Sequence, residues 1–379
     1  MDRSVGSAQA LLASAIGRLH RTDARGFLYY AAPLVALLLG FLTVSILLLL
    51  IRVSPFTAYS ALITGAVGSQ YAIGLTLVRS VPLIFVGLSV AVAFRAGLFN
   101  IGAEGQLQMG GLATTYVALD TGNLPLAIMA GFAAGAGWGA IPGYLRARLQ
   151  ITEVISTIML NFIAITTVVL IASGPLEDPQ ATYPTTPLTP ASTNLPNILA
   201  GTPLHAGIFL ALICAVITQF TLYRTSLGFR IRAVGLNAKA AQHAGMSVTR
   251  TIVVALALSG GLAGLTGSVE ILGVQHQLGE GWSSGWGYTG IAVAFLARSS
   301  PLAVVPAALL YGFLSAGSSN MQISTGTPGA LTSVLEGLPI LYLLALTARP
   351  PRSRTVVIDE TVSQSVEAPA PEPAEAQPT

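Results

Sequence analysis

The chain has 379 residues, of which 53% are hydrophobic and only 9% are charged, and its formal net charge is +3. A soluble globular domain carries about 25% charged residues, so this composition excludes that class. A membrane-spanning helix needs about 20 apolar residues, and uncharged apolar runs recur here from residue 28 to residue 348. Together with a mean hydropathy of +0.72, they predict an all-α polytopic membrane protein.

The expected elements follow in chain order. Residues 1–27 are predicted to form a cytoplasmic N-terminal segment with a short interfacial helix, because apolar residues recur there at helical spacing among four arginines. About ten transmembrane helices are then expected, at Leu28–Ile51, Ala72–Phe94, Gly105–Leu119, Leu124–Leu145, Val154–Ser173, Leu204–Tyr223, Ile252–Leu272, Trp286–Ala297, Leu302–Ala316 and Leu331–Leu346.

The distribution of charge predicts the orientation of these spans. Basic residues follow each even-numbered span, whereas the odd-numbered exits are acidic or neutral, except for Arg52. Because cytoplasmic loops carry an excess of Lys and Arg, the even-numbered exits and both termini are expected in the cytoplasm. The segment 349–379 is expected to be a disordered acidic tail, since residues 355–379 hold five acidic and no basic residues.

The midpoint of the chain is marked by residues 174–203, which hold seven prolines and no basic residue. This segment is predicted to be an extracytoplasmic loop with five spans on each side. An odd number of spans per half gives the two halves opposite orientations, so span counting predicts two five-helix halves related as an inverted repeat.

The third and eighth spans are short, and each follows a polar stretch with several glycines, at residues 97–106 and 279–288. Short or Gly-interrupted spans at matching places in two halves indicate a translocation site; two tight surface turns are the alternative. A carboxylate at position 104 could also be structural, because it is stabilised at a helix N-terminus. The predicted substrate pathway comprises Phe99, Asn100, Gly102, Glu104, Gln106, Trp286 and Tyr288.

Two further features have structural interpretations. The fourth span carries Gly131, Gly135, Gly139 and Gly143 on one helix face, which favours tight helix packing over a gate. The long basic segment Arg224–Arg250 has apolar residues at helical spacing, a break at residues 235–237 and a glycine at 245. It is expected to form a short helix–turn–helix on the inner face, although a charged loop set by topology alone is the alternative.

Several chemistries are not indicated. No Walker A motif surrounds Lys239, the only lysine, so this chain is not expected to bind ATP by itself. Four scattered histidines give no metal-ligand spacing, and the single Cys214 cannot form an intrachain disulfide. No metal, cofactor or nucleic-acid partner is therefore expected.

Residues 94–106, with the sequence FRAGLFNIGAEGQ, strongly resemble the signature of permease subunits of nucleoside-type ABC importers. The wider group includes ribose and branched-chain amino-acid permeases. Residues 227–237 are similar to the cytoplasmic coupling loop of that family. Just beyond this stretch, Lys239 stands where the family usually has an acidic residue. The resemblance covers residues 28–348, and it implies a role in ATPase coupling for Arg232, Asn237, Ala240, Ala241 and Gly245.

This resemblance implies a non-catalytic transmembrane subunit, residues 28–348, in the plasma membrane. The expected partners are an ATP-binding subunit, a second permease subunit (as a homo- or heterodimer) and an extracytoplasmic substrate-binding lipoprotein, and the expected substrate is a nucleoside. A simple-sugar or branched-chain amino-acid ABC permease remains open. A secondary transporter is disfavoured by the coupling loop, and a membrane enzyme by the lack of a catalytic constellation.

Overall fold

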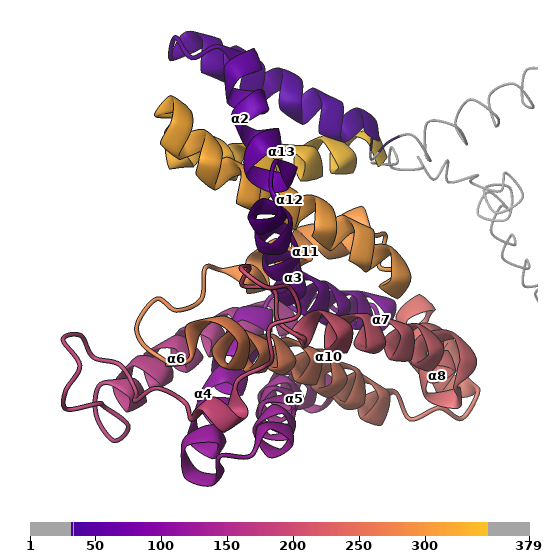
Figure 1. Cartoon of the computed structure of the whole chain (residues 1–379). Coiled ribbons are helices and arrows are strands. Elements are labelled where there is room, and N and C mark those ends of the chain that lie inside the picture. Colours follow the sequence, from indigo (N-terminus) through magenta and orange to yellow (C-terminus); the bar gives the residue numbers. More distant parts are fainter. Residues whose placement is uncertain (1–31, 33, 348–379) are drawn as a thin grey trace, which may run out of the picture. The chain divides into compact units, whose positions relative to one another are not determined.

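The computed structural model describes residue 32 and residues 34–347, which form helices joined by turns and loops (Figure 1). Except for Thr347, these residues belong to one compact unit, Met1–Leu346. Within the described part the only β-pairing is two isolated bridges. The predicted interfacial helix in residues 1–27 and the predicted tail 349–379 lie outside the described residues.

An N-terminal helix, Leu34–Leu50, precedes the labelled elements. The remaining helices are α2 (Pro55–Val67), α3 (Gln70–Arg95), α4 (Ala103–Thr121), α5 (Leu124–Leu149), α6 (Glu153–Ala172), η1 (Ala191–Thr193), α7 (Gly207–Arg224), α8 (Ser226–Leu236), α9 (Ala238–His243), α10 (Val248–Glu270), η2 (Ile271–Gln275), α11 (Trp286–Leu296), α12 (Pro301–Thr325) and α13 (Gly329–Thr347).

The structure confirms an all-α polytopic membrane protein, with a helix in each of the ten ranges expected to span. Seven described helices are long and apolar enough to cross a bilayer, namely α3, α5, α6, α7, α10 with η2, α12 and α13. The other three ranges differ: α11 and the N-terminal helix are shorter apolar helices, and α4 is long but rich in buried polar residues. Helix α2 was not expected.

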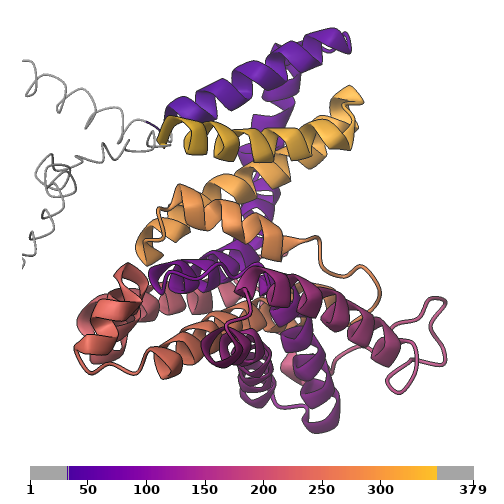
Figure 2. The same cartoon turned by 180° about the vertical axis from the view of Figure 1, so that it is seen from behind.

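The glycine stripe of α5 packs tightly against α10, as predicted. A Cβ added to Gly135 would collide with the carbonyl oxygen of Gly260, and one added to Gly139 with that of Leu256. Small residues allow helix backbones to approach this closely. Helix α10 also packs against α3 and α4 (Figures 1 and 2), so it lies at the centre of the helices that hold the site.

The predicted extracytoplasmic loop is attached to the segment that leads from α10 to α11. Backbone N–H groups of Thr186, Thr189 and Leu195 donate to the carbonyl oxygens of Leu278 (2.8 Å), His276 (2.7 Å) and Leu272 (2.8 Å). Residues 186–195 therefore form an ordered cover over η2 and the stretch before α11.

Candidate functional site

The first turns of α4 and α11 meet at one carboxylate. Glu104, in the first turn of α4 and only 3% exposed, accepts hydrogen bonds from the hydroxyl of Ser283 (2.6 Å) and the backbone N–H of Gly287 (2.8 Å). The first N–H groups of a helix lack intrahelical partners and carry a partial positive charge. One carboxylate therefore stabilises both helix N-termini, and the two glycine-bearing stretches from the sequence lie together.

Close approach of the two helices requires a glycine in α11. A Cβ added to Gly287 would collide with the backbone of Glu104. On the other side, Gly285 precedes α11 in the left-handed conformation (φ +78°), which favours glycine. The polar, glycine-rich sequence before α11 is thus explained by its position, because the first turn of α11 packs against the first turn of α4.

Two predicted pathway amides bind each other. Asn100 donates to Oε1 of Gln106 (2.8 Å) and accepts from its Nε2 (3.1 Å), and both residues are 1% exposed. Asn100 also donates to the hydroxyl of Ser259 in α10 (2.8 Å) and accepts from the N–H of Gly102 (3.0 Å). These amides are therefore part of a buried network that shapes the turn before α4, and their polar atoms do not face an open cavity.

A third amide, Asn161 of α6, holds the same turn from outside. It accepts from the N–H of Gly105 (2.8 Å) and donates to the carbonyl of Ile101 (2.9 Å) and to the hydroxyl of Tyr288 (3.4 Å). Asn161 was not predicted from the sequence to be part of this site. A lone amide in an otherwise apolar span was the available signal, because polar groups at membrane depth are costly unless they are paired.

Aromatic side chains form the accessible edge of this site. Phe99 is 51% exposed and Tyr288 is 48% exposed, while Trp286 is half-buried. A cavity of about 230 Å³ lies between the turn at residues 99–101 and α11, and Phe99 and Asn100 line it, whereas Trp286 and Tyr288 do not. Of the seven predicted pathway residues, the aromatic ones are accessible, whereas Asn100, Gly102, Glu104 and Gln106 are buried.

Trp282 and Gln108 are further members that the sequence analysis did not assign. The indole N–H of Trp282 donates to Oε1 of Gln108 (2.5 Å), and both residues are buried. The ring of Trp282 lies where Gly111 leaves room for it. This contact attaches the stretch before α11 to the middle of α4.

The predicted coupling segment folds as α8 and α9, so the expected helix–turn–helix is confirmed. Asn237 ends α8 and its side chain accepts from the N–H of Ala240 (3.0 Å), which caps α9. Gly245 follows α9 with φ +80°, the left-handed geometry expected of a glycine after a helix end. Arg232 donates to the carbonyl of Leu222 (2.9 Å) and stacks near the ring of Tyr223.

Some apolar residues of this segment are buried within the chain, and others are exposed. Ala241, for which the resemblance implies a coupling role, is 4% exposed, and Ile231 is 0% exposed, because both pack within this chain. Leu236 and Phe229 are instead 89% and 55% exposed. Helical spacing identified an apolar face correctly, but the chain itself covers that face. Leu236 and Phe229 therefore form the exposed apolar surface of the segment.

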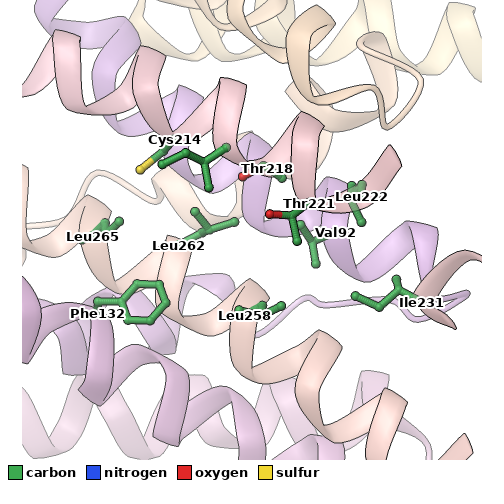
Figure 3. A pocket seen from close by; sticks show the side chains of 11 residues that line it. Val92, Phe132, Cys214, Thr218, Thr221, Leu222, Ile231, Leu258, Leu262 and Leu265 are labelled. Carbon is green, nitrogen blue, oxygen red and sulfur yellow. The ribbon is translucent and has the colours of Figure 1, made fainter. Parts of the chain in front are cut away.

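A second cavity, of about 260 Å³, lies between α5, α7 and α10 and reaches α8 (Figure 3). Its lining is apolar apart from the hydroxyls of Thr218 and Thr221 and the thiol of Cys214. A polar solute needs a few placed polar groups for orientation, so this cavity does not suit a nucleoside as well as the edge formed by Phe99 and Tyr288.

The fold and this site define a multi-pass membrane protein whose polar residues converge inside a helical bundle. Residues 72–344 match the family described as branched-chain amino acid transport system / permease component, so the chain belongs to this permease family. It is a plasma-membrane permease subunit.

Several curated relatives are similar over most of their length. The chain is 41% identical to the guanosine ABC transporter permease protein NupP of Bacillus subtilis, over 82% of this chain and 92% of the relative. It is 35% identical to the nucleoside ABC transporter permease protein NupB of Lactococcus lactis (82% and 89%) and 34% identical to the glucose ABC transporter permease protein TsgB13 of Haloferax volcanii (86% and 89%). No solved structure matches the chain.

Proposed function

We propose that this chain is the permease subunit of an ABC importer that carries a nucleoside, driven by ATP hydrolysis on a separate subunit. The observation that carries the proposal is the similarity to the guanosine permease of Bacillus subtilis, at 41% identity over 82% of the chain. A second nucleoside permease relative supports the same substrate class. In this proposal the chain has no catalytic residue of its own.

A simple-sugar substrate is the second candidate, and one specific observation favours it. The glucose permease relative from Haloferax volcanii is 34% identical over 86% of this chain. Nucleosides and simple sugars share a hydroxyl-bearing ring, but only the nucleoside adds an aromatic base. The exposed rings of Phe99 and Tyr288 offer surfaces for stacking, which favours the nucleoside.

The proposed pathway runs along the aromatic edge where α4 and α11 meet. Phe99, Trp286 and Tyr288 would contact the base of the solute. Asn100, Gly102, Glu104 and Gln106 would fix the backbone that presents these rings. Irregular backbone at membrane depth requires cover by protein or a watery cavity. Asn161 binds the backbone of the turn before α4, and Glu104 binds the backbone at the start of α11.

The proposed assembly contains an ATP-binding subunit, a second permease subunit and an extracytoplasmic substrate-binding lipoprotein. The segment α8–α9 would contact the ATP-binding subunit through Leu236 and Phe229, which are exposed. The shape of that contact would be maintained by Arg232, Asn237, Ala240, Ala241 and Gly245. Asn237 caps α9, and the side chain of Ala241 within α9 is buried.

The proposed topology has ten spans in two inverted halves, with both termini in the cytoplasm, residues 174–203 outside and residues 224–250 inside. It is tested with single cysteines in intact cells, after replacement of Cys214. A cysteine at Ser192 should react with an impermeant maleimide, whereas a cysteine at Gln242 should react only after the membrane is opened. The opposite pattern would overturn the topology.

The transport function is tested with the complete importer in proteoliposomes. Radiolabelled guanosine should accumulate only when ATP is supplied to the side of the ATP-binding subunit, and unlabelled glucose in excess should not compete. Accumulation of glucose with no uptake of guanosine would establish the sugar alternative. ATP-independent exchange of guanosine would instead indicate a secondary transporter.

A further inference from the structure

A cleft of about 390 Å³, with both polar and apolar side chains in its lining, lies between the end of α2, the start of α3 and the last turns of α12, apart from the α4–α11 site. Hydroxyl groups of Ser69, Tyr71 and Ser319 and the amide of Asn320 line it. Its composition therefore differs from that of the apolar cavity between α5, α7 and α10, and hydroxyl and amide groups are the partners that a neutral polar solute requires.

A partly buried cation lies behind one wall of this cleft. Arg79 donates from one guanidinium nitrogen to the carbonyl of Ser315 (2.6 Å) and to the hydroxyls of Ser315 (3.1 Å) and Ser319 (2.9 Å). Ser319 is thus both a lining residue and a partner of the arginine. The guanidinium of Arg79 is therefore held by serine oxygens.

The arginine indicates a functional role for this region. A charge at membrane depth is costly, and such residues commonly mark solute or ion pathways. Tyr71, Leu75 and Arg79 follow one another at intervals of four along α3, so they lie on one face of the helix. Because Tyr71 is 56% exposed and is in the first turn of α3, this face leads from an accessible aromatic ring to the partly buried guanidinium.

Asn320 of α12 attaches helix α2, which forms another wall of the cleft. Its Nδ2 donates to the carbonyl of Ala61 in α2 (2.7 Å), and a Cβ added to Gly65 would collide with the Asn320 side chain. An amide nitrogen carries two hydrogens, and within the described residues Asn320 Nδ2 makes this one hydrogen bond. The second hydrogen is available to a ligand in the cleft.

We infer that this cleft is an outer binding site for the transported solute, a neutral ring compound with hydroxyl groups such as a nucleoside. The inference rests on the proposed function, and on the proposed topology, which places the start of α3 at the extracytoplasmic side. Tyr71 contributes a ring for stacking and a hydroxyl for a hydrogen bond, and Ser319 and Asn320 contribute further hydrogen bonds to the hydroxyls of the solute. The positive charge of Arg79 disfavours cationic solutes.

The test measures protection from chemical labelling in the complete importer. Cys214 is replaced by alanine, a cysteine is placed at Asn320, and its reaction with an impermeant maleimide is followed on this chain with and without guanosine. Thr57→Cys, exposed in the first turn of α2 and outside the cleft, is the control. Guanosine should slow labelling at position 320 at least fivefold and leave labelling at position 57 unchanged.

A conservative pair of variants tests the same site if the cysteine variant folds poorly. Tyr71 and Tyr116 are both 56% exposed, but only Tyr71 lines the cleft. Tyr71→Phe should raise the KM for guanosine uptake several-fold with little change in kcat, whereas Tyr116→Phe should leave both unchanged. Equal KM values for the two variants would count against the site.

The outcomes separate this inference from the proposed function. An importer that takes up guanosine but shows no protection at position 320 would overturn the outer site alone. Labelling at position 320 that is blocked by assembly with the second permease, regardless of solute, would also overturn it and identify a subunit contact. Failure to take up any nucleoside or sugar would overturn the proposed function itself.

Discussion

The carboxylate of Glu104 accepts a hydrogen bond from the backbone N–H of Gly287 at 2.8 Å, and so joins the first turns of α4 and α11. Glu104→Ala should lower stability by about 1–3 kcal/mol, because it leaves a buried N–H without a partner. Ser283→Ala removes only a donor to the same carboxylate and should cost less. Thermal unfolding of the purified variants measures both effects, and equal losses would contradict this role of Glu104.

The amides of Asn100 and Gln106 should behave as a unit. Asn100→Ala leaves the buried amide of Gln106 unpaired, at a cost of about 1–3 kcal/mol, whereas Gln106→Ala should cost less, because Asn100 keeps Ser259 and Gly102 as partners. The double variant should lose clearly less stability than the two single variants together, because neither amide then remains to be satisfied. Uptake should fall in parallel with stability. A loss of uptake with unchanged stability for Asn100→Ala would instead indicate direct contact with the solute.

The contact between α5 and α10 depends on glycine at particular positions. Gly135→Ala places a methyl group against the backbone of Gly260 and should lower stability by about 1–3 kcal/mol. Gly137→Ala, two residues away on the same helix, meets no atom within 4 Å. It should be neutral or stabilising by up to about 1 kcal/mol, because alanine favours the helix. The melting temperatures of the two detergent-solubilised variants measure these effects.

The stability of the protein should fall in mild acid because of His205. Its side chain is 1% exposed, and Nδ1 accepts from the N–H of Gly207 (3.1 Å). Burial, with a smaller contribution from His276, lowers the pKa of His205 to about 4. The unfolded state, with a pKa near 6.5, therefore binds the proton first as the pH falls. The contribution of His205 is complete above pH 6.5 and decreases towards pH 4, by about 2 kcal/mol at pH 5.

Melting temperatures at pH 7.5 and pH 5 of paired variants check this assignment. His205→Gln should reduce the difference between the two pH values, whereas His243→Gln, which alters an exposed histidine of α9, should retain it. A full pH difference in the absence of His205 would assign the effect to another group.

The exposed surface of α8–α9 should determine binding of the ATP-binding subunit. Leu236→Asp places a charge on a side chain that is 89% exposed and at the proposed contact, so co-purification of the partner should fall at least tenfold. Leu188→Asp, on a residue 67% exposed in the loop before α7, is the control and should leave co-purification intact. Retained binding in the Leu236 variant would remove this residue from the contact.

The fold followed from the sequence more closely than the site did. Apolar runs located a helix in each of the ten expected ranges, because hydropathy responds directly to burial in a bilayer. Helix α2 was missed, since Pro55, Thr57 and Ser60 interrupt its apolar character. The run of residues 105–119 lies in α4, whose glutamines and several threonines are buried against protein, and the polarity of α4 reflects that environment.

Hydrogen-bond and packing partners that come from distant parts of the chain could not be predicted from sequence patterns. The stretches before α4 and α11, which were grouped because they occupy matching positions in the two halves, meet at Glu104, and their role as a substrate pathway stays a prediction. The pairing of Asn100 with Gln106 depends on a turn whose geometry no periodicity specifies. In the same way, the spacing in α8 and α9 identified an apolar face, but the burial of Ala241 by its own chain could be learned only from the structure.

The hydrogen bonds from Thr186, Thr189 and Leu195 to the stretch after α10 have a mechanical consequence. That stretch continues directly into the start of α11, where Gly287 meets Glu104. Residues 186–195 are therefore joined by main-chain hydrogen bonds to the segment that leads to the start of α11. A displacement of this loop should in consequence also displace Gly287 and its contact with the carboxylate of Glu104.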